Sequence, residues 1–177
     1  CRLPKTTSCC SKSRSFSDAI ASNPRAPLPA PSGGIPATAA RTPPRVMAAL
    51  AAVHASSSDL KAMADALKAM QKDAKAGRIP RESDIAFHMA IANACANSVM
   101  QDTLKLYLQA RNGPLFERLG DYFESPASWV SAIAEHQEVF AAIQAHDSQG
   151  ARKTMQKHLR QAHKRFSASW RSAPSRA

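Results

Sequence analysis

The sequence predicts an all-α protein, an antiparallel bundle of about six helices preceded by a disordered N-terminal segment. Two observations predict this fold. From residue 46 onward, apolar residues recur every three or four positions, as along the buried face of a helix, and no alternating strand pattern of useful length occurs. Short links rich in Gly, Pro, Ser and Asn separate these stretches, and helices joined by short links pack antiparallel. We therefore divide the chain into a segment 1–45 and a helical domain 46–172.

Residues 1–45 differ in composition from the rest of the chain. They hold seven Lys or Arg against the single acidic residue Asp18, eight of the 12 prolines and three of the 4 cysteines, but only one aromatic residue, Phe16. A segment with so little to bury cannot offset the entropy lost on folding, so we expect it to be disordered, with an organellar transit peptide as the alternative. The chain begins at Cys1 rather than Met, which raises the hypothesis of a fragment or a shifted reading frame.

The charge balance and the cysteine pattern limit the classes of protein to consider. The 177 residues include 24 basic and 13 acidic side chains, a net charge of +11, so a polyanion such as nucleic acid is a partner to consider. The basic segment predicts salt-sensitive, nonspecific adhesion to DNA. The sequence has no disulfide framework, no pair of cysteines at metal-knuckle spacing and no apolar run of about eighteen residues. We expect a cytoplasmic protein with no membrane partner.

Two helices open the predicted domain. The first has an apolar stripe of Met47, Leu50 and Val53. We expect Pro43 and Pro44 to cut this helix off on its upstream side. The second helix is predicted to begin with Ser58 as its N-cap and to end at Gly77. Its apolar stripe consists of Leu60, Met63, Leu67 and Met70.

The third predicted helix starts at Ser83 or Asp84, and its inward side carries Ile85, His88, Met89, Ala92 and Cys95. The fourth follows Asn97 and ends at the turn Asn112-Gly113-Pro114. Its inward side carries Val99, Met100, Leu104, Tyr107, Leu108 and Arg111.

A short turn of helix is expected within residues 115–123. Ser125 and Pro126 then open a fifth helix, because serine is a good N-cap and proline suits the first helical position. The inward residues of this helix are Trp129, Ile133, His136, Phe140 and Ile143. Asp147 or Ser148 caps a sixth helix, whose inward residues are Met155, His158, Ala162 and Phe166.

Three histidines, His88, His136 and His158, fall in phase with the apolar stripes of three different helices. A polar ring inside a bundle needs a partner, and a backbone carbonyl is the ordinary one. Asp84 stands four residues before His88, the spacing that lets one helix supply two ligands to one metal. Imidazole nitrogens with one carboxylate suit a borderline divalent ion such as zinc or nickel, with positions left for water or an anion.

Two stretches carry a resemblance to a known family. The run from Asp84 to Asn97 resembles the D-x-x-F-H…N signature of the FadR-type C-terminal ligand-sensing (FCD) domain of GntR-family bacterial transcription regulators. The run from Glu135 to Leu159 is similar to the E-H-x-x-I-x-x-A-I…D…A…M-x-x-H-L pattern of the same domain. The resemblance covers about residues 46–168. It implies a fold like the FadR C-terminal domain, with a divalent metal bound by Asp84, His88, His136 and His158.

The resemblance also implies a function. A small organic acid would reach the metal from the bundle cavity and, in a homodimeric regulator, control DNA binding; the activity is binding rather than turnover, so we expect no enzyme and assign no catalytic residue. DNA itself would be bound only through a winged helix-turn-helix, which is not recognisable in residues 1–45.

Two further residues are candidates for binding the acid. Asn97 matches the family's Asn at the turn between the third and fourth helices, where its side chain is better suited to fixing the backbone. Arg111 ends the inward stripe of its helix, where a guanidinium can pair with a carboxylate. An alternative role for Arg111 is an interaction with the helix dipole or a surface ion pair. Residues 111–116 also resemble the R-x-S-P-x-W stretch of the hexuronate-responsive branch, which makes a uronate one candidate acid.

Two other classes of function stay open. The adjacent pair His146-Asp147 is like that of the helical HD phosphohydrolases, with His88 or His136 as further ligands, although Asp147 also suits the N-cap of the sixth helix. The other class is a metal-free helical dimerisation module with chance histidines.

Overall fold

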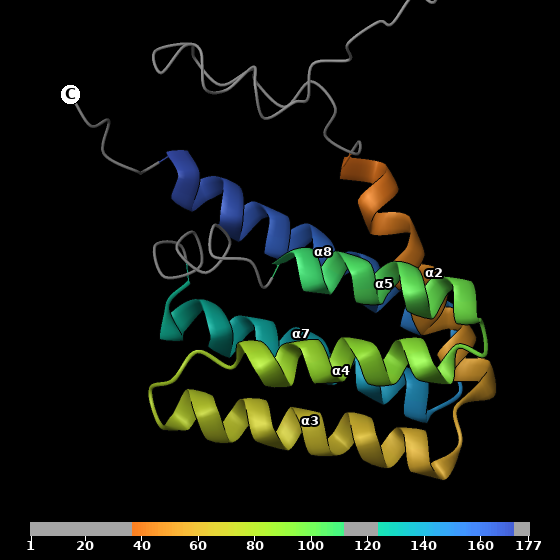
Figure 1. The fold of residues 1–177 in the computed structure, drawn as a ribbon. Helices are drawn as coiled ribbons and strands as arrows, with labels where there is room; N and C mark the ends of the chain where they lie inside the picture. The colour runs from red at the N-terminus through yellow and green to blue at the C-terminus, as the bar shows by residue number, and fades with distance from the viewer. Residues whose placement is uncertain (1–36, 112–123, 172–177) are drawn as a thin grey trace, which may run out of the picture. The chain divides into compact units, whose positions relative to one another are not determined.

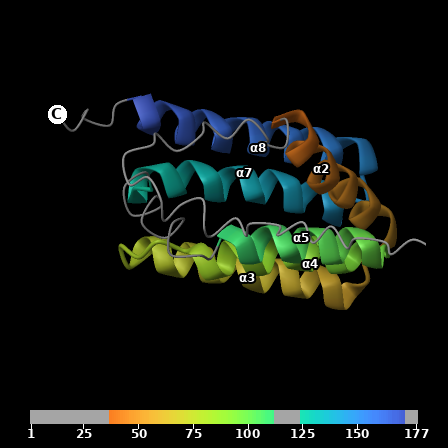
Figure 2. The ribbon, with the colours of Figure 1, turned by 45° about the horizontal axis from the view of Figure 1, so that its top comes forward.

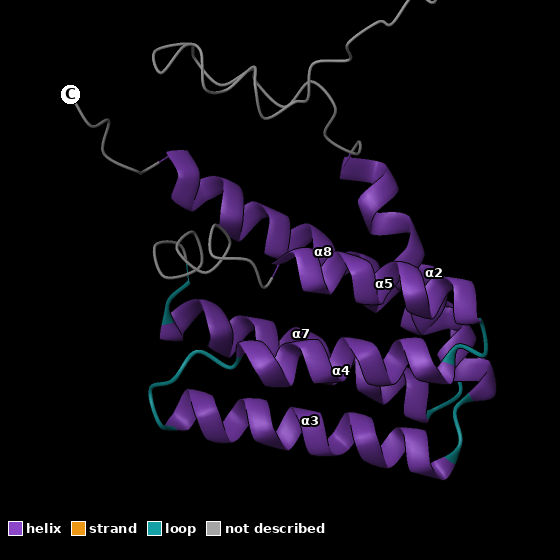
Figure 3. Ribbon diagram, in the orientation of Figure 1, coloured by secondary structure: helices purple, strands orange, loops and turns teal. Residues whose placement is uncertain are grey.

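Six α-helices account for nearly all of the residues that the computed structural model describes, which are 37–111 and 124–171. The helices are α2 (Ala37–His54), α3 (Ser57–Lys75), α4 (Arg81–Ala94), α5 (Ser98–Arg111), α7 (Pro126–Gln144) and α8 (Ser148–Arg171). Figure 3 shows only helices and short connections in this part of the chain. The predicted all-α fold is confirmed, whereas the helical turn expected within 115–123 lies outside the described residues.

The helices pack both on their neighbours in sequence and on helices from distant parts of the chain. The consecutive helices α3 and α4 pack together, as do α7 and α8. In addition, α8 packs along α2, and α3 packs along α7. Figures 1 and 2 both show α3 beside α4 and α7 beside α8. Because short turns join these neighbours, the chain reverses direction between them and the bundle is antiparallel.

The core between the helices is rich in methionine. The larger apolar side chains with at most 2% of their surface exposed come from five helices: Met47, Met63, Met70, Phe87, Ile91, Val139, Ile143 and Met155. Burying one such side chain contributes about 1.5–3 kcal/mol to the stability of the fold. No helix in the described ranges is long and apolar enough to cross a membrane.

The first helix is longer than the sequence predicted. It begins at Ala37 and runs through Pro43 and Pro44, which were expected to cut it off. That prediction is wrong. The fixed φ of proline is compatible with a helix, and the cost of each proline is limited to one missing backbone hydrogen bond and crowding of the preceding turn. The turns that follow are held in place by the complete burial of Met47 and Ala51 against the core.

The inward faces of two helices are narrower than predicted. Val53 at the end of α2 is 59% exposed, and on α5 Val99 and Tyr107 are 74% and 49% exposed. The apolar spacing predicts that all three face inward, and for these residues the prediction is wrong. The helix α5 packs on α4 and α2, and its buried face is reduced to Leu104 and Leu108, which are 6% and 4% exposed.

The helix ends follow the capping chemistry, with one shift. Ser56, not Ser58, is the N-cap of α3: its hydroxyl accepts a hydrogen bond from the Asp59 backbone N–H at 3.2 Å, and the Asp59 carboxylate accepts one from the Ser56 N–H at 2.9 Å. Ser56 is preferred because only there does an acidic residue stand three positions later, completing a capping box. Gly77, with φ of +71°, follows the C-cap of α3 as predicted.

Candidate metal centre

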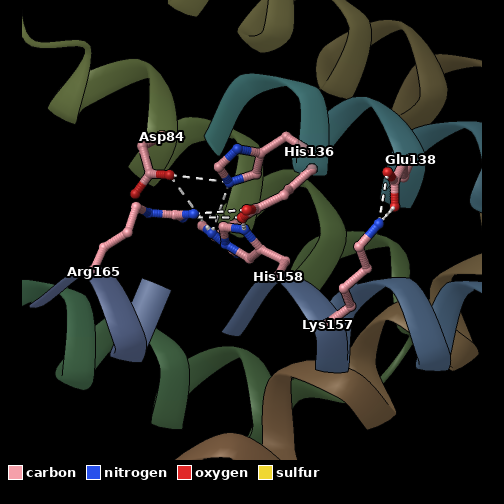
Figure 4. A network of polar contacts seen from close by, with 8 residues as sticks. Asp84, His136, Glu138, Lys157, His158 and Arg165 are labelled. Atoms are coloured by element: carbon pink, nitrogen blue, oxygen red, sulfur yellow. Dashed lines mark hydrogen bonds and ion pairs between the residues drawn. The ribbon is translucent and has the colours of Figure 1, made fainter. Parts of the chain in front are cut away.

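The four predicted metal ligands come together from three helices. Asp84 and His88 project from one face of α4, because residues four apart are neighbours on a helix surface. His136 comes from the middle of α7, and His158 comes from α8. All four side chains are buried, with 7%, 8%, 0% and 5% of their surface exposed in chain order. Figure 4 shows Asp84, His136 and His158 pointing toward one another.

The ligand atoms lie at separations that suit a shared ion. The Nε2 atom of His136 is 3.3 Å from Nε2 of His88 and 3.1 Å from Oδ1 of Asp84, while that Oδ1 is 3.7 Å from Nε2 of His88. One ring nitrogen from each of the three histidines lies within 4.8 Å of the others. With metal–nitrogen bonds of about 2.0–2.1 Å, two ligand atoms are about 3.3 Å apart in a tetrahedral site and about 3 Å apart in an octahedral one.

Glu135 orients the His158 ring. Oε2 of Glu135 lies 3.0 Å from Nδ1 of His158, and both residues are buried. A carboxylate can only accept, so Nδ1 carries the proton and donates it, which leaves the lone pair of the neutral ring on Nε2. Metal-binding histidines commonly donate their second ring nitrogen to a carboxylate in this way.

Arg165 in turn holds Glu135. Its Nη1 and Nη2 atoms donate to Oε1 and Oε2 of Glu135 at 2.6 and 2.9 Å, a two-toothed ion pair. Burial works to raise the pKa of the Glu135 carboxyl, but the hydrogen bonds from His158 and Arg165 outweigh it and hold that pKa at about 2. Burial also lowers the pKa of His158, and the hydrogen bond to Glu135 opposes this. The ring is therefore favoured in its neutral form, the form that binds metals.

His136 is enclosed most completely. The Phe87 ring packs edge-on against it, with ring centroids 5.0 Å apart. Its Nδ1 atom is buried and has no hydrogen-bond partner in the described part of the chain. For Nε2 of His136 to offer its lone pair to an ion beside Asp84 and His88, the ring proton has to lie on Nδ1. Nε2 of His136, Nε2 of His88 and Oδ1 of Asp84 face one another, and a divalent cation is a group that this set of nitrogen and oxygen ligands fits.

Comparison with known proteins gives the family. Residues 45–161 match the family described as the FCD domain. The chain belongs to the FCD-domain family. Two curated relatives, from Escherichia coli (strain K12) and Shigella flexneri, are both named "Putative L-lactate dehydrogenase operon regulatory protein". Each is 33% identical over 91 residues, which are 50% of this chain but only 35% of the relative, so the chain spans about a third of their length.

A solved structure named E. coli McbR/YncC has the same fold as this FCD domain. The TM-score is 0.64 with 20% sequence identity, and the match covers 73% of this chain and 61% of that chain. The predicted family and the predicted FadR C-terminal-like architecture are therefore confirmed. The match to the FCD domain includes Asp84, His88, His136 and His158, but it ends before Arg165.

Of the other two candidate ligand-binding residues, Asn97 lies away from the candidate metal centre. Asn97 is exposed at the turn between α4 and α5, more than two helical turns beyond His88. Its Oδ1 accepts a hydrogen bond from the Met100 N–H at 3.0 Å, so the amide fixes the start of α5. Arg111 is the last residue of α5, and its side chain lies outside the described residues, as does the rest of the stretch that resembles the hexuronate-responsive branch. That branch stays a prediction.

The His146-Asp147 pair, considered above as part of a hydrolase site, is also separate from the centre. His146 follows His136 by ten residues, about 15 Å along a helix. Its Nδ1 atom lies 2.8 Å from the Ala52 carbonyl oxygen, and its backbone has a φ of +55°. Asp147 Oδ1 accepts the Gly150 N–H at 2.8 Å and so caps α8, as predicted.

Sequence reasoning did not give Glu135 and Arg165 their roles in the FCD domain. The sequence identified Glu135 only as part of the family pattern, with no role of its own, and did not identify Arg165 as a candidate. Two signals point to them in retrospect: Glu135 directly precedes a buried histidine, and Arg165 stands seven residues after His158, on the same side of α8.

Proposed function

We propose that this FCD domain is the effector-sensing part of a transcription regulator, in which Asp84, His88, His136 and His158 hold a divalent metal that binds a small organic acid. One observation carries the proposal. In a chain of this family, a carboxylate and three imidazoles from three helices converge in a buried centre, at separations typical of ligands around one ion.

The charges in the centre support both the metal and the acid. Asp84 contributes one negative charge, the three histidines bind metals as neutral rings, and the charges of Glu135 and Arg165 offset each other. A divalent ion would therefore leave an excess of about one positive charge in a buried environment, and an anion would compensate it. A bound metal supplies an electrostatic anchor for a carboxylate; zinc or nickel suits this mixture of nitrogen and oxygen ligands.

The identity of the acid is proposed at the level of its class. The two curated relatives carry the name of an L-lactate dehydrogenase operon regulatory protein, which makes a small 2-hydroxy acid such as L-lactate the first candidate. The sequence resemblance to the hexuronate-responsive branch makes a uronate the second candidate. In both cases a carboxylate would face the four ligand side chains, and Phe87 would close the apolar wall beside His136.

For acid binding to control transcription, it has to affect DNA binding by the whole regulator. We propose how this occurs. Acid binding would change the relative placement of two DNA-binding parts in a homodimer, a coupling between separate sites. Exposed apolar side chains on α5, which are 74% exposed at Val99 and 68% at Leu106, support pairing with a second copy. Light scattering on the wild type and on Leu106→Ser tests this, because a monomeric wild type would contradict the homodimer.

Elemental analysis of the purified protein tests the metal. We expect about one zinc or nickel ion per chain in the wild type and loss of that ion in His136→Ala, because the variant removes a buried ligand. Asp147→Ala is the matched control: Asp147 caps α8 outside the centre, so this variant should keep the metal. Loss of metal from Asp147→Ala but not from Asp84→Ala would instead favour the hydrolase alternative, and a wild type without metal would refute the proposal.

Thermal unfolding of the metal-loaded protein tests the acid. A ligand at one hundred times its Kd stabilises the folded state by about 2.7 kcal/mol, which raises the melting temperature by several degrees in a domain of this size. We expect such an increase with L-lactate or a hexuronate, and none after the metal is removed. An increase of equal size in the metal-free protein would show that the acid binds without the metal.

A further inference from the structure

We propose that Arg165 is a positioning residue for the metal centre, acting through Glu135 on His158. The inference rests on the proposed function, because it assigns the role of Arg165 relative to the proposed metal. It concerns a residue that is not one of the four proposed ligands and that lies beyond the segment matched to the FCD domain, which ends at residue 161.

The geometry forms a chain of three side chains that ends at the centre. Both oxygens of the Glu135 carboxylate accept hydrogen bonds from Arg165, at 2.6 and 2.9 Å. One of those oxygens, Oε2, also lies 3.0 Å from Nδ1 of His158. Figure 4 shows the Arg165 guanidinium directed toward the group of side chains around His158. Because Oε2 is shared, the position of Arg165 determines where the acceptor for His158 lies.

Glu135 needs this support because of its environment. The residue is only 9% exposed, and a buried carboxylate without a compensating partner is costly. His158 alone offers it a single hydrogen bond. The planar guanidinium satisfies both carboxylate oxygens at once and fixes the plane of the carboxylate. With that plane fixed, the Nδ1–H tautomer of His158 is selected, and the Nε2 lone pair is available to an ion.

A second ion pair between the same two helices serves as an internal comparison. Lys157 of α8 donates to both oxygens of Glu138 of α7, at 2.9 and 2.8 Å. This pair also joins α7 to α8, but its side chains are 54% and 46% exposed, and they pair with each other rather than with a histidine. Figure 4 shows it to one side of the centre. A change at Lys157 therefore reproduces the loss of an α7–α8 ion pair without touching the proposed relay.

The test compares zinc affinity and histidine tautomers in four full-length proteins: the wild type, Arg165→Met, Arg165→Lys and Lys157→Met. Competition with a chromogenic chelator gives the Kd for zinc. Nitrogen-15 spectra of the metal-free proteins, with His158 assigned by a His158→Gln variant, show which ring nitrogen carries the proton. We expect about tenfold weaker zinc binding and a mixture of His158 tautomers in Arg165→Met, at the low end of the range for loss of an outer-shell partner. Lys157→Met should stay within twofold of the wild type.

The variant Arg165→Lys separates the effect of positioning the Glu135 carboxylate from the effect of the positive charge at residue 165. Lysine keeps the positive charge but cannot form the two-toothed pair, so we expect zinc affinity between those of the wild type and Arg165→Met. This variant also keeps the test available if Arg165→Met does not fold. Wild-type affinity together with an unchanged His158 tautomer in the Arg165 variants would overturn the proposal. A wild type that binds no zinc would refute the proposed function, and the tautomer comparison in the metal-free proteins would still decide the role of Arg165.

Discussion

Replacing Glu135 by glutamine should destabilise the metal-free protein by an amount that depends on pH. The pKa of the Glu135 carboxyl is about 2 in the folded chain, against an ordinary value of 4.5, because the hydrogen bonds from His158 and Arg165 outweigh the effect of burial. Since the pKa is lowered by folding, the ionised carboxylate stabilises the fold above about pH 4.5, and this stabilisation is lost as the pH falls toward 2.

The size of the effect follows from the two pKa values. A difference of about 2.5 between them corresponds to roughly 3 kcal/mol of unfolding free energy, at about 1.36 kcal/mol for each pKa unit. About 2 kcal/mol of this is already lost at pH 3, where the unfolded chain is largely protonated and the folded chain is not. Glutamine keeps the shape of the side chain but has no charge at any pH. The stability difference between the wild type and Glu135→Gln should therefore shrink by about 2 kcal/mol between pH 7 and pH 3.

Urea unfolding followed by circular dichroism measures this difference, with protein stripped of metal beforehand and samples at pH 7, 5 and 3. Glu138→Gln is the control, because Glu138 lies on the same helix and pairs with a lysine in an exposed position. Exposed pairs contribute about 0.2–1 kcal/mol, so the control difference should be small at every pH. A Glu135→Gln difference that stays constant from pH 7 to pH 3 would refute the role assigned to the buried ion pair.

Three further predictions concern the core, a helix end and the metal. Met70→Ala should lower the unfolding free energy by about 2–5 kcal/mol in urea titrations, because the side chain is fully buried, and a loss below 1 kcal/mol would mean that the site is not closely packed. Ser56→Ala should cost about 1 kcal/mol in the same assay through loss of the capping box of α3, while Ser58→Ala should cost less. Zinc affinity, measured by chelator competition, should weaken as the pH is lowered from 7.5 to 5.5, because histidine ligands must be deprotonated; affinity independent of pH would exclude them as ligands.

The helices were predictable from the sequence because their apolar spacing repeats over several turns. The same spacing could not show how much of each face a neighbour covers, so Val99 and Tyr107 were assigned inward although α5 leaves them exposed. The rule that proline ends a helix failed at Pro43 and Pro44 because packing farther along α2 holds the backbone in place. Apolar spacing and proline position gave wrong predictions where contacts with distant segments determined the burial of a side chain or the extent of a helix.

In the candidate site, too, some residues were predictable from the sequence and others were not. Asp84 and His88 share a face of any helix, and the phase of His136 and His158 placed both on buried faces, so the sequence was sufficient to predict that these four side chains lie inside the bundle. Their role as metal ligands stays a prediction. Arg165 pairs with Glu135 across 30 residues of chain, and only the packing of α7 against α8 brings the two together. The spacing of residues along the sequence does not show that these two side chains are in contact.

The methionine-rich core provides an intrinsic reporter of motion. Met47, Met63, Met70 and Met155 come from three different helices, two of them from α3, and have no exposed surface. Peroxide converts methionine to its sulfoxide only when it can reach the sulfur, so each of these side chains reacts only while the surrounding helices are apart. Mass spectrometry of peroxide-treated protein would therefore measure how often each region of the bundle opens. Equal protection of all four would identify a single cooperative unit, and a faster reaction at one of them would identify the helix that detaches first.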